Sequence, residues 1–245
     1  MKQKRRKRRS KKNQRKPFLL LLLSVFLFAL SFYYFAPARM LFTDIPQNSQ
    51  QKKAVQMGVD LSQWQVDVEY KKIWREGYRF GIIRTGFGSS YEDPLFETHY
   101  NGLTQAGLDV GAYHYSHATT IQEALDEAYL VLEILEDKQL DLPIFYDIET
   151  DRQHHLSKSE LTQIVDTFIT TLENQGYKVG VYAALSWYED RLDMEILNDI
   201  PIWVANYSDY LDYDGPYDYW QFTQTGLVNG VNGYCDINIL YEKES

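Results

Sequence analysis

The sequence of residues 57–245 predicts an α/β fold in which eight strands close into a barrel. Eight short runs rich in β-branched and aromatic residues follow one another along the chain, and helical segments separate the first five of them. Alternating strands and helices indicate a parallel sheet with helical crossovers, and eight such strands favour closure into a barrel. An open, doubly wound sheet is the alternative. The predicted strands are 57–61, 80–85, 110–115, 142–149, 179–183, 202–206, 219–222 and 235–238.

Helix boundaries carry clear local signals. Asp93-Pro94 offers an N-cap and an N1 proline, while Thr120-x-x-Glu123 and Ser157-x-x-Glu160 are capping boxes. Glycines that can adopt a left-handed conformation follow at Gly77, Gly107 and Gly176. The predicted helices cover about 68–76, 94–106, 120–135 and 157–175. Beyond the fifth strand the connections are mostly loops.

The first 36 residues differ sharply in composition from the barrel. Residues 1–16 carry eleven lysines and arginines and no acid, and residues 18–35 contain no charge, glycine or proline. This pattern predicts a basic cytoplasmic tail (1–16) and a transmembrane signal-anchor helix (17–36). A polar linker (37–56) is expected before the domain at 57–245.

The anchor predicts a single-pass protein of the cell membrane whose C-terminal domain is extracytoplasmic. A secretory signal peptide usually has a shorter apolar core, of about 7 to 15 residues. An uncleaved anchor is therefore favoured. Cleavage near Ala38, in the small-residue stretch Ala36-Pro37-Ala38, with release of the domain, is the alternative.

Charge and cysteine content restrict the partners. Beyond residue 16, 14 lysines and arginines face 34 acids, a net charge near −20. Such a domain is a poor candidate for binding nucleic acid or anionic lipid.

Cys235 is the only cysteine, so no intrachain disulfide can form, and it is expected to be a small buried hydrophobe. The histidines form no ligand set with acids, so no metal or cofactor is expected. A monomer is expected.

The fourth predicted strand carries the candidate chemistry. Leu142–Glu149 is apolar until Asp147 and Glu149. Because strand side chains alternate, these two carboxylates project from one face, about 6.6 Å apart along the strand. Glycosidase carboxylate pairs lie roughly 5 to 9.5 Å apart. A strand that simply runs out into a polar loop is the structural alternative.

Polar residues end most of the other strands, where a closed βα barrel places its active site. Singly, each has a structural explanation: Asp60 could cap a turn, Arg84 could form a surface ion pair, and His114 could be a satisfied core histidine. Acids at the ends of strands one, four and eight are harder to explain this way, because strands one and eight are neighbours in a closed barrel. The candidates are Asp60, Arg84, His114, Asp147, Glu149, Tyr182, Asn206, Gln224 and Asp236.

Six motifs occur in order along the domain. They are Gly58-Val59-Asp60-Leu61-Ser62-x-Trp64-Gln65, Gly111-Ala112-Tyr113-His114-Tyr115, Asp147-Ile148-Glu149, Ile202-Trp203-Val204-Ala205, Trp220-Gln221-Phe222-Thr223-Gln224 and Gly230-Val231-Asn232-Gly233-x-Cys235-Asp236-Ile237-Asn238. Over about residues 57–241 the chain resembles the glycoside hydrolase family 25 lysozymes, or N-acetylmuramidases. The resemblance implies a flattened, TIM-like (β/α)5(β)3 barrel. It also implies hydrolysis of the β-1,4 bond between N-acetylmuramic acid and N-acetylglucosamine in peptidoglycan, in cell-wall catabolism or remodelling.

The resemblance implies a role for each acid. Glu149 matches the general acid, Asp147 its partner, and Asp60 and Asp236 the two supporting aspartates. A general acid must be protonated, so a raised pKa is expected for Glu149, with repulsion from neighbouring carboxylates as its source. An ionised Asp147 would stabilise an oxocarbenium-like transition state directly, or would orient the substrate's 2-acetamido group.

Further residues are expected to contact the glycan. Aromatic rings, including Trp64 and Tyr207, could stack on sugar faces, although packing explains any one of the twenty tyrosines equally well. Two residues depart from the family pattern: Cys235 stands where an aliphatic residue is usual, and Asn206 where glutamine is common. The predicted substrate-binding residues are Arg84, Tyr113, His114, Tyr115, Tyr182, Trp203, Asn206 and Gln224.

Two other functions are compatible with these features. A catalytically inactive glycan-binding module would have no need of carboxylates at three strand ends. A chitinase-like glycosidase would carry further aspartates where Ile144, Phe145 and Tyr146 stand.

Overall fold

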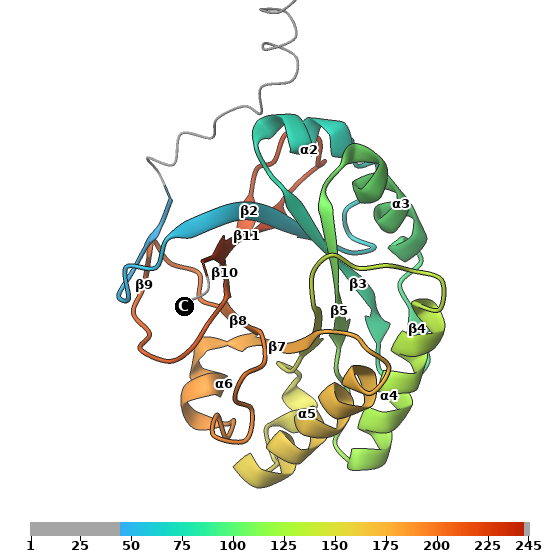
Figure 1. Cartoon of the computed structure of the whole chain (residues 1–245), viewed down its shortest axis with the longest axis vertical. Helices are drawn as coiled ribbons and strands as arrows, with labels where there is room; N and C mark the ends of the chain where they lie inside the picture. Colours follow the sequence, from blue (N-terminus) through green and yellow to red (C-terminus); the bar gives the residue numbers. More distant parts are fainter. Residues whose placement is uncertain (1–44, 243–245) are drawn as a thin grey trace, which may run out of the picture. The chain divides into compact units, whose positions relative to one another are not determined.

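The last long strand closes the sheet into a barrel. In the computed structural model, which describes residues 45–242, β11 (Cys235–Tyr241) pairs with both β10 (Tyr219–Gly226) and β2 (Ala54–Leu61). Strand β2 also pairs with β3 (Phe80–Phe87), so the order β2-β11-β10-β8-β7-β6-β5-β3 returns to its start. Figure 1 shows these strands as a ring. The predicted eight-stranded α/β barrel is confirmed over the open sheet.

Six neighbouring strand pairs of the barrel are parallel and two are antiparallel. Both antiparallel pairs involve β11, which departs from the parallel sheet that the sequence predicts. The reason is its connection: residues 227–234 join β10 to β11 and are fewer than the roughly dozen residues that a parallel crossover needs, so the two strands run in opposite directions. The remaining barrel strands are β5 (Asp109–Tyr115), β6 (Ile144–Asp147), β7 (Val179–Ala184) and β8 (Ile202–Ala205).

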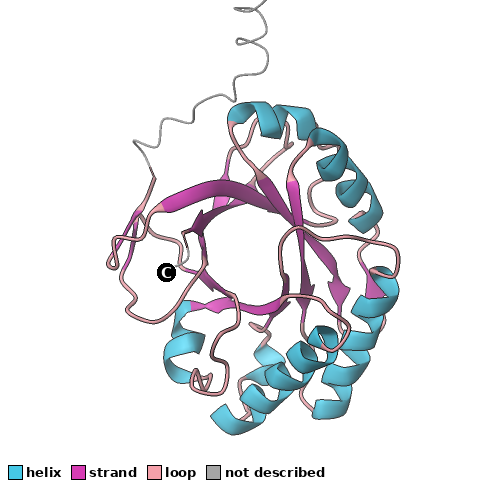
Figure 2. Cartoon of the chain, viewed as in Figure 1, coloured by secondary structure: helices cyan, strands magenta, loops and turns pink. Residues whose placement is uncertain are grey.

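The helices lie outside the ring of strands (Figure 2) and begin and end close to their predicted boundaries. Thr120 caps the N-terminus of α4 by accepting from the Glu123 amide, and Ser157 and Glu160 form a complete capping box at α5. The last helix, α6, was not predicted from residue patterns, but the (β/α)5(β)3 barrel that the resemblance implies has a helix at this place, after the fifth barrel strand. The helices are α2 (Tyr70–Glu76), α3 (Phe96–Ala106), α4 (Ile121–Ile134), α5 (Lys158–Glu173) and α6 (Leu185–Asp190).

Part of the predicted linker belongs to the folded domain. Strand β1 (Gln47–Asn48) pairs in parallel with β9 (Tyr210–Leu211), and β2 begins at Ala54, three residues before the predicted strand. The side chain of Gln50 donates to the backbone oxygens of Tyr213 and Gly215 at 2.9 and 2.7 Å. Backbone and side-chain amide hydrogen bonds hold this segment in place. It therefore needs no apolar face, and its sequence shows no apolar periodicity.

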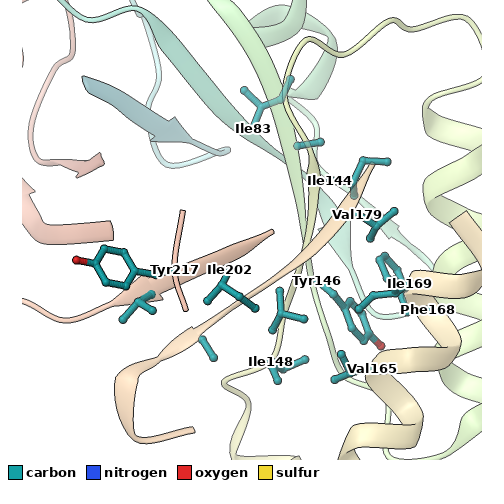
Figure 3. Packing of buried hydrophobic residues seen from close by; sticks show 14 of the residues in the cluster. Ile83, Ile144, Tyr146, Ile148, Val165, Phe168, Ile169, Val179, Ile202 and Tyr217 are labelled. Carbon is teal, nitrogen blue, oxygen red and sulfur yellow. The ribbon is translucent and has the colours of Figure 1, made fainter. Parts of the chain in front are cut away.

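The buried side chains form two layers, one on each side of the strands. The outer layer packs the sheet against the helices: Phe168 of α5 stacks on Tyr146 of β6 with ring centroids 3.8 Å apart. Figure 3 shows both rings beside Val165, Ile148 and Val179. The inner layer fills the barrel and consists of Phe80, Ile82, Phe145, Tyr182, Trp203, Ala205 and Tyr219.

The predicted basic tail (1–16) and signal-anchor helix (17–36) lie outside the described residues. Within residues 45–242, no helix combines the length and the apolar character needed to span a membrane.

Candidate active site

Strand β6 and the residues after it alternate between the two sides of the barrel wall. Tyr146 and Ile148 belong to the layer under the helices, whereas Phe145 belongs to the barrel interior. By the same alternation Asp147 and Glu149 face the interior and its mouth. Asp147 is buried at 4% exposure, and Glu149, two residues further on, is exposed. One carboxyl group therefore lies within the barrel mouth and the other at its opening.

Four carboxyl groups meet at this mouth. Asp60 and Asp236 are directly opposite each other on the paired strands β2 and β11. Asp60 is close enough to Glu149 and Asp147 for its charge to raise the pKa of both. The negative charge of Glu149 in turn raises the pKa of Asp236. We call Asp60, Asp147, Glu149 and Asp236 the carboxylate cluster, which gathers acids that lie far apart in the sequence.

Burial raises every pKa in the carboxylate cluster, and repulsion from neighbouring carboxylates adds to it at Asp147, Glu149 and Asp236. The pKa of Glu149 is raised, as predicted; although the residue as a whole is exposed, desolvation of its carboxyl group by the surrounding protein contributes more than the charge of Asp60. Burial, followed by the charges of Glu149 and Asp60, raises the pKa of Asp147 well above its usual range, and nearby Arg84 only partly opposes this. The surroundings of Asp147 therefore favour a neutral carboxyl group, whereas the sequence analysis expects an ionised partner.

Two buried amides hold the acids from the chain's opening and closing strands. Gln221 on β10 donates to Asp60 Oδ2 at 2.9 Å and to Asp236 Oδ2 at 3.4 Å. Asn238 on β11 donates to Asp60 Oδ2 at 2.8 Å, while its own Oδ1 accepts from Trp203 Nε1 at 2.9 Å. The floor of the mouth is thus a continuous hydrogen-bonded layer over the aromatic interior.

Several predicted substrate-binding residues lie around the carboxylate cluster. Tyr113, half-buried, packs edge-on against Trp203, and the charges of Asp60, Asp147 and Asp236 contribute to raising its pKa. The Tyr182 hydroxyl donates to Gln221 Oε1 at 2.8 Å. Tyr115 lies near Asp147 and Glu149, whose charges contribute to its raised pKa. Arg84 forms an ion pair with Asp93 at 2.8 Å. Its guanidinium group also lies close enough to Asp147 to lower the pKa of that carboxyl group.

Three of the predicted residues occupy other positions. His114 is completely buried between the sheet and the helices, where Nδ1 bonds to Thr85 Oγ1 and Nε2 to the Gly88 oxygen, both at 2.9 Å. Burial lowers the pKa of this imidazole to about 3, so it is a neutral core residue. Asn206 shapes the turn after β8, accepting from Ser208 Oγ and Trp220 Nε1. Gln224 is exposed on β10, beyond a register shift.

Trp203 also differs from a sugar-stacking residue. It is 1% exposed and packs against Phe145 and Tyr182 with ring centroids 5.1 and 4.6 Å apart. It therefore supports the floor of the mouth from below. Exposed rings near the mouth include Trp64, at 72% exposure beyond the end of β2, and Tyr207, at 50% exposure beyond β8.

The sequence analysis did not single out Gln221 and Asn238, although both lie in motifs that it noted. A signal was available, because Asn238 is two residues from Asp236 and must share its face of the strand. Gln221 is likewise two residues beyond Tyr219, which points into the barrel.

Residues 59–231 match the family model described as Glycosyl hydrolases family 25. The chain belongs to this family. The resemblance noted in the sequence is thereby confirmed, and family 25 membership accounts for the closed barrel with acids at its mouth.

Relatives within family 25 include named lysozymes. The chain is 28% identical over 182 residues to the autolytic lysozyme of Clostridium acetobutylicum, a match that covers 74% of this chain and 54% of that protein. It is 25% identical over 195 residues to lysozyme M1 of Streptomyces globisporus, covering 74% and 66%. The match thus spans only about half the length of the Clostridium relative.

Solved structures of family 25 share the fold. The modular autolysin LytC of Streptococcus pneumoniae superposes with a TM-score of 0.70 at 25% identity, covering 80% of this chain and 49% of that one. LytC has also been solved in complex with a synthetic peptidoglycan ligand, with a TM-score of 0.71 at 24% identity. A family 25 glycosyl hydrolase from Bacillus anthracis superposes with a TM-score of 0.69 at 22% identity, covering 78% and 91%.

Proposed function

We propose that this chain is a muramidase that hydrolyses the β-1,4 bond between N-acetylmuramic acid and N-acetylglucosamine in peptidoglycan. The observation that carries the proposal is the carboxylate cluster at the barrel mouth, with an exposed Glu149 whose pKa is raised. Family 25 membership and the lysozyme relatives support the same activity.

Glu149 is the proposed general acid. Its exposure allows contact with substrate, and its raised pKa keeps the carboxyl proton available toward neutral pH. The proton moves to the bridging oxygen as the bond to C1 of the muramic acid unit breaks, which releases the 4-hydroxyl of the glucosamine unit. Water then adds to C1, and Glu149 recovers its proton from that water.

Asp147 is the proposed partner of Glu149. Its Oδ1 is buried and has no hydrogen-bond partner within the described residues. This oxygen is available to the substrate's 2-acetamido N–H as that group approaches C1. Binding such a donor favours the carboxylate form of Asp147 at the moment when positive charge develops on the sugar. An unpartnered oxygen thus supports the orienting role over a purely electrostatic one.

The proposal is tested with purified peptidoglycan and the purified full-length chain. The wild type should create new reducing ends that are N-acetylmuramic acid. Glu149→Gln should lower the rate on the order of 10²- to 10⁴-fold, the range for losing a general acid, while Glu173→Gln, an exposed change at the end of α5, should not. Reducing ends of N-acetylglucosamine, preference for chitin oligomers, or binding without cleavage would each contradict the muramidase proposal.

We further propose that residues 17–36 anchor the chain in the cell membrane with the barrel outside. The basic composition of residues 1–16 and the apolar composition of 18–35 support this. An anchored chain should stay in the membrane fraction after extraction with alkaline carbonate. Recovery of the activity in culture medium, with a new N-terminus near Ala38, would instead support cleavage.

A further inference from the structure

Gln221 connects more of the candidate active site than any acid does. Its side chain is 2% exposed and makes four hydrogen bonds. Oε1 accepts from the hydroxyls of Tyr182 and Tyr207 at 2.8 and 2.9 Å. Nε2 donates to Asp60 and to Asp236. An amide has two acceptor sites and two N–H donors, so this arrangement uses all of them.

The neighbouring amide has only one possible orientation. Trp203 Nε1 is a donor only, so the atom of Asn238 that faces it must be the oxygen. The Asn238 nitrogen then faces Asp60 Oδ2, as observed. Since Asp60 Oδ2 accepts from both amides, at 2.8 and 2.9 Å, this oxygen carries no proton.

The proton of the aspartate pair belongs to Asp236. The carboxyl groups of Asp60 and Asp236 hydrogen-bond to each other, which two carboxylates can do only if one of them is protonated. Asp60 receives two short amide bonds, whereas the one amide bond that Asp236 receives from the described residues is the 3.4 Å bond from Gln221. The group with more donors is better stabilised as an anion.

We propose that Gln221 is a positioning residue for the reaction: with Asn238, it holds the Asp60–Asp236 pair as a carboxylate and a carboxylic acid, so that the negative charge stays on Asp60, where it faces Glu149. The expected effect on catalysis rests on the proposed muramidase function. The arrangement of the proton within the aspartate pair does not depend on that function.

The consequence is control over the general acid. The charge of Asp60 is the one that raises the pKa of Glu149, after burial. If the amide of Gln221 is lost, the proton is shared more evenly between the two aspartates and charge moves away from Asp60. The pair also accepts a second proton more readily. The second proton removes the negative charge of the pair, which reduces the repulsion on Glu149 and lowers its pKa.

Several titratable or charged groups face the pair and Glu149, and a pH profile must be interpreted with all of them in view. Burial is the first cause of the raised pKa of Tyr113, Tyr182 and Tyr207. They therefore stay neutral through the working range. The groups are Asp60, Arg84, Tyr113, Asp147, Glu149, Tyr182, Tyr207, Cys235 and Asp236.

The test compares pH profiles of kcat/KM for the full-length chain, Gln221→Leu and Tyr207→Phe on soluble peptidoglycan fragments. The limb at high pH reports loss of the Glu149 proton. We expect this limb to move to lower pH by about one unit in Gln221→Leu, the size of a shift from losing one charged hydrogen bond. Tyr207→Phe removes one of two phenol donors, and the half-exposed position tolerates it, so a smaller shift in the same direction is expected. Gln163→Leu, exposed on α5, is the matched control and should not shift the limb.

A lower kcat with an unmoved limb in both variants would overturn the inference and leave Gln221 a structural residue. A direct measurement separates this result from failure of the proposed function. Titration of ¹³C-labelled aspartate carboxyl groups by NMR should show a proton on Asp236 in the wild type and its redistribution in Gln221→Leu. The NMR titration is informative even if the wild type cleaves no peptidoglycan. Independent titration of Asp60 and Asp236 would refute the premise that the pair holds one proton on Asp236.

Discussion

Replacing Asp236 by asparagine should make the folded chain more stable at neutral pH. Asparagine has nearly the shape of a protonated aspartate and can still donate to Asp60, but it does not have to bind a proton to fold. In the folded chain, burial and the charge of Asp60 raise the pKa of Asp236 from 3.8 to about 9. The wild type must therefore take up a proton on folding at any pH within that window, and the variant need not.

The magnitude follows from the linkage between protonation and folding. Between roughly pH 4 and 9 the folded chain holds a proton that the unfolded chain has released, so stability falls as pH rises through this window. Each pH unit above the ordinary pKa of an aspartate lowers the free energy of unfolding by up to about 1.36 kcal/mol. At pH 7 the loss of stability therefore has a ceiling of about 4 kcal/mol. Because Asp60 shares the proton, we expect Asp236→Asn to gain about 2 to 4 kcal/mol at pH 7.

Urea denaturation followed by tryptophan fluorescence at pH 4, 5.5, 7 and 8.5 measures this difference. The advantage of Asp236→Asn should be close to zero at pH 4 and grow up to pH 8.5. Asp212→Asn removes the same charge from an exposed position and controls for net charge. A variant that is less stable at pH 7, or whose advantage does not change with pH, would show that Asp236 is ionised in the folded chain and would refute the reasoning.

Three further changes test the scaffold. Phe168→Ala removes a completely buried ring that stacks on Tyr146, so the free energy of unfolding should fall by about 3 to 5 kcal/mol in the same urea assay; a loss below 1 kcal/mol would contradict the packing described. Gly58→Ala would place a Cβ 2.2 Å from the Phe80 ring inside the barrel, so both Tm and activity should drop, and an unchanged Tm would show that the ring can move. Ser157→Ala breaks the capping box of α5 and should cost about 1 kcal/mol without changing kcat.

Sequence patterns predict the barrel well because its elements are marked locally. The N-caps Thr120 and Ser157 and the glycines Gly77 and Gly107 stand at helix ends in the structure, with a complete capping box at Ser157. The direction of β11 was not predictable from its own composition. Its orientation depends on the length and path of the connection from β10, and those are properties of tertiary structure.

The candidate active site was predicted in part. The alternation of side chains along a strand distinguishes the predicted residues that meet at the mouth from His114, which does not. The acids at the ends of β2, β6 and β11 meet as expected, but His114 lies one residue from Tyr113 and so points to the other side of the wall. Alternation could have excluded it. Gln224 is different: register shifts after Gln221 interrupt the alternation of β10, and no residue pattern announces them.

The pairing of β11 with β2 also has a consequence for biosynthesis. Asn238 and Asp60, bonded at 2.8 Å, are 178 residues apart, and the pair forms only after residues 235–241 have left the ribosome. A nascent or prematurely terminated product that lacks this segment has neither Asp236 nor a closed ring. The ring and the carboxylate cluster are therefore completed together, late in translation.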